Sequence, residues 1–121
     1  MDFEEIVTVS EAILKEVVVK NADITVESFT VNNEQEISDP YFLEAFLFMK
    51  ALSSDQRETF RKILVQNGIE CLSMLFGIVE NSDDADLGQR LSVYFGEEDI
   101  SANLQSAFLV ADERVRGNFN M

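Results

Sequence analysis

The chain has 121 residues, 46% of them hydrophobic with ten Phe, which suffices for one domain with a core. It carries 23 acidic and 9 basic residues, no histidine, and a formal net charge of −14. Direct binding to nucleic acid or to an anionic membrane is disfavoured, because both require clustered positive charge. The absence of histidine excludes Ser-His and Cys-His nucleophile systems and zinc sites built on histidine.

The start of the chain, MDFEEIVTVS, is acidic, whereas a secretory signal begins with basic residues. No uninterrupted apolar run reaches the roughly 18 residues of a membrane span. We therefore expect a cytoplasmic protein that does not bind membranes. The single cysteine, Cys71, cannot form an internal disulfide.

Apolar residues recur at helical spacing from residue 2 to residue 20, which predicts an amphipathic helix. Asn21-Ala22-Asp23 is typical of a turn. Residues 24–31, ITVESFTV, are rich in β-branched side chains and form a candidate strand, with a surface loop as the alternative.

The next predicted helix runs from Pro40 to about Leu52, because Ser38 or Asp39 can cap it and Pro40 suits the first helical position. This helix is apolar on more than one side. We expect a second buried face that includes Phe48, with an exposed contact for a partner as the alternative. The short connection to the following helix predicts a helical hairpin.

The longest predicted element is a central helix over residues 54–81, with Ser53 and Gln56 matching a capping box. Its second half is apolar nearly all round, so we expect neighbours on several sides and a buried Cys71. Gly68 weakens a helix and indicates a kink, a break into two helices, or a close helix crossing.

Residues 83–88 are predicted to be an acidic loop, since their spacing lacks the Gly and Glu of an EF-hand. Residues 90–96 alternate as a strand does, a turn follows, and Ser101 or Asn103 can cap a last helix that contains Phe108. The predicted fold is α+β and predominantly α. It is a single domain, 1–121, with three or four packed helices around helix 54–81, a small β element at strand 90–96, and 24–31 as a further candidate.

No phosphate-binding glycine motif is present, and the many neighbouring carboxylates follow from the composition. Catalytic carboxylates require an apolar pocket that shifts one pKa, which a sequence does not reveal. We therefore expect no enzymatic activity, no cofactor and no metal.

Three segments together form a packing pattern: Leu75 to Ser82, the strand Leu91 to Gly96, and the helix that carries Leu104, Gln105, Phe108 and Leu109. Over residues 40–111 this pattern resembles that of small acidic bacterial proteins of the polymorphic-toxin immunity type. The resemblance implies a buried helix followed by a strand and a short helix. It also implies a binding protein that neutralises a toxin.

The acids are unevenly distributed, with six acids and no base between Lys20 and Lys50. A cationic protein partner is favoured, because complementary fields accelerate encounter. Our leading hypothesis is an immunity-type inhibitor of a cationic toxin such as a nuclease. Its expected partner-binding residues are Glu34, Glu36, Asp39, Asp83, Asp84 and Asp86.

Other interpretations of the same sequence stay open. One is a phage DNA mimic that blocks a nucleic-acid-binding defence protein. Another is a homodimer formed through the Phe residues of Pro40 to Leu52. A third is a small-molecule enzyme. The simplest is that the acidic surface only keeps the protein soluble.

Overall fold

The computed structural model describes residues 1–31, 34–81 and 89–119. Its elements in chain order are α1 (Phe3–Ile13), the π-helix η1 (Leu14–Val19), α2 (Lys20–Val31), the 3-10 turn η2 (Glu34–Glu36), α3 (Pro40–Ala51), α4 (Ser54–Glu80), β1 (Tyr94–Phe95), β2 (Glu98–Asp99), the 3-10 turn η4 (Ser101–Asn103) and α5 (Leu104–Phe119). The predicted class, α+β and predominantly α, is confirmed.

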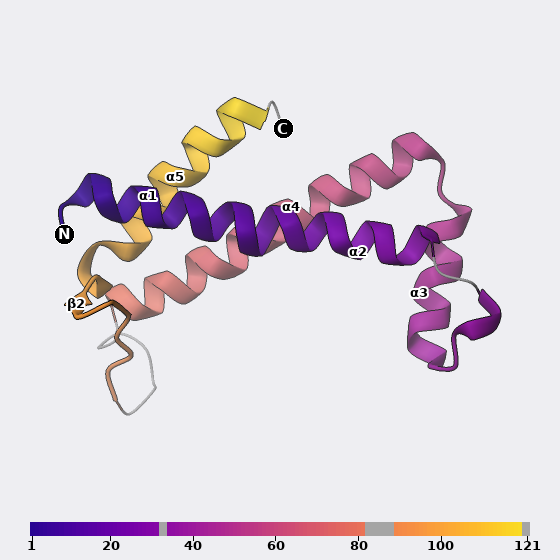
Figure 1. Cartoon of the computed structure of the whole chain (residues 1–121), viewed down its shortest axis with the longest axis horizontal. Coiled ribbons are helices and arrows are strands. Elements are labelled where there is room, and N and C mark those ends of the chain that lie inside the picture. Colours follow the sequence, from indigo (N-terminus) through magenta and orange to yellow (C-terminus); the bar gives the residue numbers. More distant parts are fainter. Residues whose placement is uncertain (32–33, 82–88, 120–121) are drawn as a thin grey trace.

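The first three elements join end to end into one long N-terminal helix (Figure 1). The predicted turn at Asn21 and the candidate strand 24–31 are therefore wrong. Ala22 is buried in the core, and the hydroxyl groups of Ser28 and Thr30 donate to the carbonyls of Ile24 and Val26 one turn earlier. Burial and these local hydrogen bonds outweigh the β propensity of the segment.

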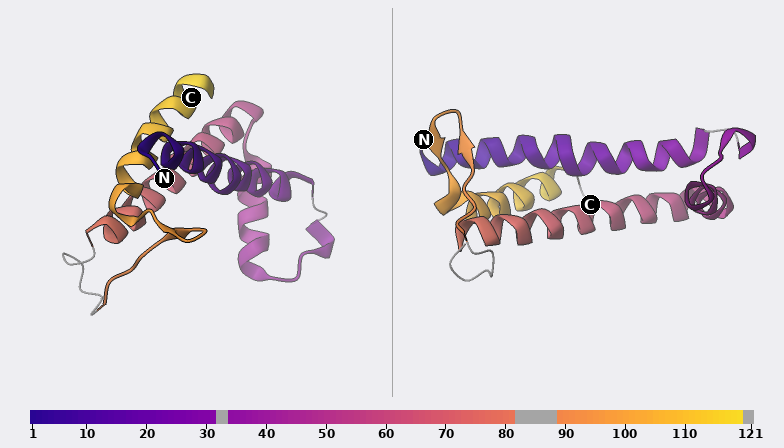
Figure 2. Two further views of the ribbon diagram at one scale, coloured as in Figure 1. Left: turned by 60° about the vertical axis from the view of Figure 1, so that its left-hand side comes forward. Right: turned by 90° about the horizontal axis from the view of Figure 1, so that it is seen from below.

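Helix α4 is unbroken and runs alongside the N-terminal helix (Figure 2). Its capping box is confirmed: the Gln56 amide donates to Ser53 Oγ at 3.1 Å, and the Ser53 amide donates to Gln56 Oε1 at 2.8 Å. A Cβ on Gly68 would lie 2.9 Å from Cγ1 of Val18 in the N-terminal helix. Of the three alternatives for Gly68, a close helix crossing is thus the one observed.

Helix α5 packs on both α1 and α4 and completes the core. Its buried residues include Phe108, whose ring meets Phe76 of α4 edge-on, with centroids 5.1 Å apart. The first turn of α5 is held by the carboxylate of Glu80 at the end of α4. The amides of Gln105 and Ser106 donate to Glu80 Oε2 at 3.1 and 3.4 Å. Glu80 therefore acts as an N-terminal cap supplied by another helix.

Replacing this cap should weaken the protein. We expect Glu80→Ala to lower the free energy of unfolding by about 1–2 kcal/mol, because two amides at the start of α5 lose a charged acceptor. Urea denaturation measures the change. Glu113→Ala is the matched control: it removes an exposed carboxylate from α5 and should change stability by less than about 0.5 kcal/mol. Equal effects of the two variants would contradict the capping role.

The β element is smaller than predicted. Only Tyr94 and Phe95 of the expected strand 90–96 pair with β2, in antiparallel register around a turn where Gly96 has φ +63°. Buried Ser101 anchors this hairpin and caps neither following helix, because its Oγ accepts the Val93 amide at 2.8 Å. Hydrogen bonds from the Ser101 side chain and amide hold the pKa of the Asp99 carboxyl below its ordinary value.

The second half of α4 is less covered than predicted. Met74 is 71% exposed, and Cys71 is exposed, so the expectation of a buried thiol is wrong. The reason is that, in the described part of the chain, the N-terminal helix, η4 and α5 contact α4 and leave one of its sides open (Figure 2). By length and composition alone, α4 is long and apolar enough to cross a membrane, as the core helices of many soluble proteins also are. In its most apolar 18-residue stretch, 22% of the residues are buried.

Candidate functional site

One end of the molecule gathers three of the six residues predicted to bind a partner. We call it the α3 end; it comprises residues 23–31 of α2, residues 34–51, which include η2 and α3, and residues 54–62 of α4 (Figure 1). Asp39 caps α3 by accepting the Phe42 amide at 3.0 Å, and Pro40 occupies the first turn, as predicted.

Helix α3 packs against α2 and does not run back along α4, so the predicted helical hairpin is wrong. Figure 2 shows α3 almost end-on where α4 lies in the plane of the picture. The rings of Phe29 in α2 and Phe42 in α3 stack at 4.7 Å between centroids. This contact turns α3 away from α4 and leaves one of its sides in solvent.

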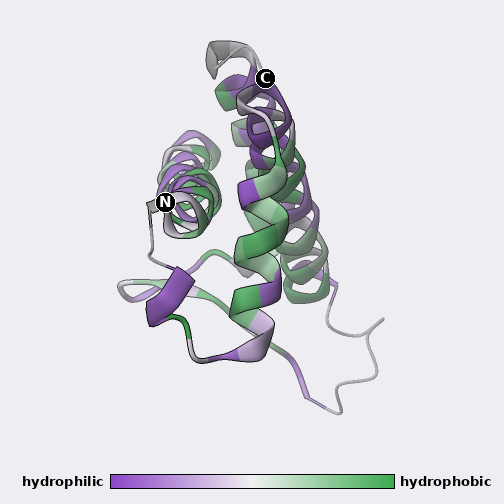
Figure 3. Ribbon diagram, turned by 90° about the vertical axis from the view of Figure 1, so that its right-hand side faces the viewer, coloured by the Kyte–Doolittle hydropathy of each residue, from purple (hydrophilic) through white to green (hydrophobic). Residues whose placement is uncertain are grey.

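All six acids between Lys20 and Lys50 are exposed, and all six lie at the α3 end; they are Asp23, Glu27, Glu34, Glu36, Asp39 and Glu44. Figure 3 faces this end and shows the hydrophilic η2 beside the more hydrophobic α3. The base-free stretch of sequence therefore folds into one contiguous region.

Bases from the start of α4 and the end of α3 partly neutralise this region. Lys50 Nζ lies 3.6 Å from Glu34, and Arg61 pairs with Asp23 at 3.3 Å and with Glu58 at 3.1 Å. The hydrogen bond from Arg61 lowers the pKa of the Glu58 carboxyl. These pairs are exposed and contribute little to stability, about 0–1 kcal/mol each. Among the described residues, Glu27, Glu36 and Glu44 form no ion pair.

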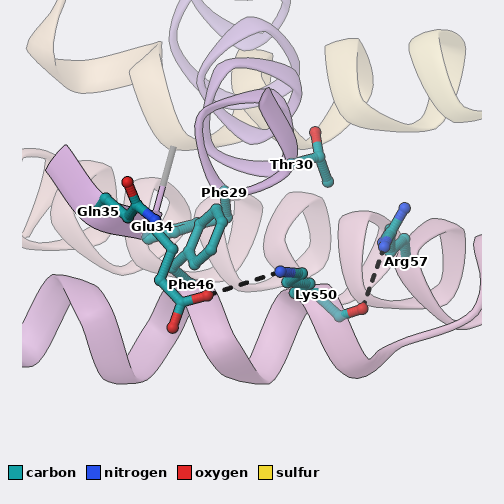
Figure 4. A pocket seen from close by; sticks show the side chains of 7 residues that line it. All are labelled: Phe29, Thr30, Glu34, Gln35, Phe46, Lys50 and Arg57. Atoms are coloured by element: carbon teal, nitrogen blue, oxygen red, sulfur yellow. Dashed lines mark hydrogen bonds and ion pairs between the residues drawn. The ribbon is translucent and has the colours of Figure 1, made fainter. Parts of the chain in front are cut away.

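A pocket of about 380 Å³ opens between α2, η2, α3 and the start of α4, lined by Phe29, Thr30, Glu34, Gln35, Phe46, Lys50 and Arg57 (Figure 4). Glu34 points across it to Lys50. Arg57 donates to the carbonyls of Met49 and Lys50 at 3.2 and 3.3 Å, which satisfies the end of α3. Phe29 and Phe46, of which Phe46 is 4% exposed, form the apolar part of the wall.

The described lining of this pocket offers charged, polar and apolar groups that could contact a partner. Among the described residues that line it there is no thiol, and the hydroxyl group of Thr30 donates to backbone carbonyls. In the described ranges no group of three or more acidic, cysteine or histidine side chains could hold a metal. The Glu34–Lys50 pair can exchange partners readily because both side chains are largely in solvent.

The outer side of α3 carries exposed aromatic residues. Tyr41 is 80% exposed and Phe48 is 55% exposed, and with exposed Glu44 they occupy positions i, i+3 and i+7 on one face. The expected second buried face of α3 is therefore wrong, because Phe46 and Met49 are its only fully buried residues in the described structure. The edge of the Phe48 ring meets Phe60 of α4 at 5.9 Å between centroids.

Three of the six predicted contact residues are thus brought together: Glu34 and Glu36 in η2, and Asp39 at the start of α3. Asp39 also serves as a helix cap. Asp83, Asp84 and Asp86 lie outside the described residues. Sequence reasoning omitted Tyr41 and Glu44, although their spacing from Phe48 was a usable signal.

No protein-family model, curated protein or solved structure matches this chain.

Proposed function

We propose that this chain is a bacterial, cytoplasmic binding protein of the immunity type, without enzymatic activity, which inhibits a cationic protein such as a nuclease toxin. The α3 end is the partner-binding surface. The observation that carries the proposal is that six exposed acids and two exposed aromatic side chains occupy the same end of the molecule.

Each component has a separate physical role. The acids attract a basic partner and accelerate encounter, as a net charge of −14 favours. Tyr41 and Phe48 supply large apolar area at the centre of the contact, which is where most binding energy resides in protein interfaces. Glu44 lies between them on the same face and can pair with a basic side chain of the partner.

The pocket beside η2 extends this surface. A basic side chain of the partner would replace Lys50 as the counter-ion of Glu34, at little cost because the existing pair is exposed. An inhibitor that binds in this way needs no chemistry of its own. It covers the site at which the nuclease binds the phosphate groups of its substrate.

The test uses purified basic nuclease-toxin domains as probes and measures their inhibition and binding by titration calorimetry at rising salt. We expect at least one to be inhibited, with an affinity that falls as salt rises. Phe48→Ala should weaken that binding by about 30-fold or more, as expected for a central aromatic contact, and Glu44→Lys should weaken it further.

Glu97→Lys is the matched control, because it reverses an exposed charge on the hairpin turn, remote from the α3 end (Figure 1). It should alter the affinity by less than about threefold. The proposal fails if no basic probe binds, if binding is insensitive to salt, or if Glu97→Lys weakens it as much as Glu44→Lys does.

A further inference from the structure

A second surface of the molecule contains a groove that is lined only by uncharged residues among those the structure describes. It lies along the middle of α4 and the N-terminal helix, and we call it the α4 face. Its exposed apolar residues are Val17 and Ile24 of the N-terminal helix and Cys71, Met74 and Leu75 of α4. The exposed fractions of Val17, Ile24, Met74 and Leu75 range from 45% to 71%. We propose that this face binds a second copy of the chain, so that the protein is a symmetric homodimer.

The α4 face contains both a groove and a ridge. The groove has a volume of about 280 Å³ and lies where the two helices approach at Gly68, between Val17 on one side and Cys71 on the other. Met74 lies one helical turn beyond Cys71, is not among the residues that line the groove, and is 71% exposed. A surface with a groove next to a ridge can complement itself across a twofold axis, as an isologous dimer requires.

The absence of charged residues in the groove lining favours a second copy of the chain as the binding partner. None of the ten residues that line the groove is charged, although 26% of the residues in the chain are. A cationic partner would find no counter-charge there. Two copies with a net charge of −14 each repel one another across most of their surface, and the uncharged groove is where they can meet without pairing like charges.

The open arrangement of the helices leaves the molecule with a large exposed surface. The chain exposes 7986 Å², about a fifth more than the roughly 6,600 Å² expected for a folded monomer of its 13.7 kDa mass. Exposed Met74, at 71%, is the kind of adaptable apolar residue that interfaces favour.

The test is sedimentation velocity under reducing conditions, from about 1 to 100 μM protein, which covers dimers of micromolar affinity. We expect wild type to shift from monomer to dimer as concentration rises. Met74→Glu should remain monomeric, because it places two buried carboxylates near each other. Tyr41→Glu is the matched control: it adds the same charge to an exposed residue at the α3 end and should still dimerise.

Cys71 provides an independent readout, since it is the only cysteine and lies on the face. Its alkylation by a maleimide should slow by about tenfold between dilute and concentrated wild type, with no such change in Met74→Glu. A wild type that is monomeric throughout overturns the proposal, as does a dimer that Tyr41→Glu disrupts and Met74→Glu does not.

Other occupants of the face would give different results. Flotation of monomeric wild type, but not of Met74→Glu, with zwitterionic phosphatidylcholine vesicles would assign the face to lipid and overturn the dimer. Dimerisation is also independent of toxin inhibition. Tyr41→Glu should abolish inhibition and keep the dimer, while Met74→Glu should do the reverse, so failure of one proposal is distinguishable from failure of the other.

Discussion

Phe108→Ala should destabilise the protein by about 3–5 kcal/mol, which is a large part of the 5–15 kcal/mol typical of a domain. Phe108 is fully buried and has the largest side chain among the most buried residues. Its ring packs edge-on against Phe76, so the truncation removes both burial and an aromatic pair that links α5 to α4. Thermal unfolding should show a fall in melting temperature of roughly 10–20 °C.

Tyr41→Ala is the control for this prediction, because it also deletes an aromatic ring from a helix but from a site that is 80% exposed. It should change stability by less than about 0.5 kcal/mol. If Phe108→Ala does not fold, Phe108→Leu gives the intermediate value, below about 1.5 kcal/mol. Equal losses in the alanine variants at positions 108 and 41 would contradict the packing of α5 in the core.

Local signals in the sequence predicted much of the fold. The caps at Asp39 and Ser53 depend on the nearest few residues, and both begin helices as expected. The predictions for residues 21–31 are wrong because the helical state of this stretch depends on distant partners: Ala22 is buried in the core and Phe29 packs on Phe42 of α3, which outweighs β-branched propensity. A short window of sequence does not contain those contacts.

At the candidate site, the exposure of the acidic residues could be predicted from the sequence, whereas the exposure of the apolar residues could not. The exposure of acids such as Glu34 and Glu36 follows from the cost of burying a charge, so a sequence suffices to place them in solvent. The exposure of Phe48, Cys71 and Met74 does not follow from residue type. It results from an open arrangement in which α3 turns away from α4 and the described elements leave one side of the second half of α4 uncovered.

Gly68 is the position on which this open arrangement depends. Gly68→Ala should destabilise the protein by about 1–2 kcal/mol, although Ala favours a helix over Gly by about 1 kcal/mol. The new Cβ would lie 2.9 Å from Cγ1 of Val18, which is buried and stiff because it is β-branched. The N-terminal helix and α4 must then separate. Urea denaturation measures the loss.

Gly117→Ala separates this steric effect from helix propensity, because Gly117 is also helical but nothing lies within 4 Å of its Cβ position. It should be neutral or stabilise by up to about 1 kcal/mol. The decisive variant is Gly68→Ala combined with Val18→Ala. Trimming Val18 makes room for the new methyl group, so the double variant should be more stable than the sum of the single changes predicts, by about 0.5–3 kcal/mol. Strict additivity would show that the two side chains do not meet and that the helix crossing is looser than the geometry requires.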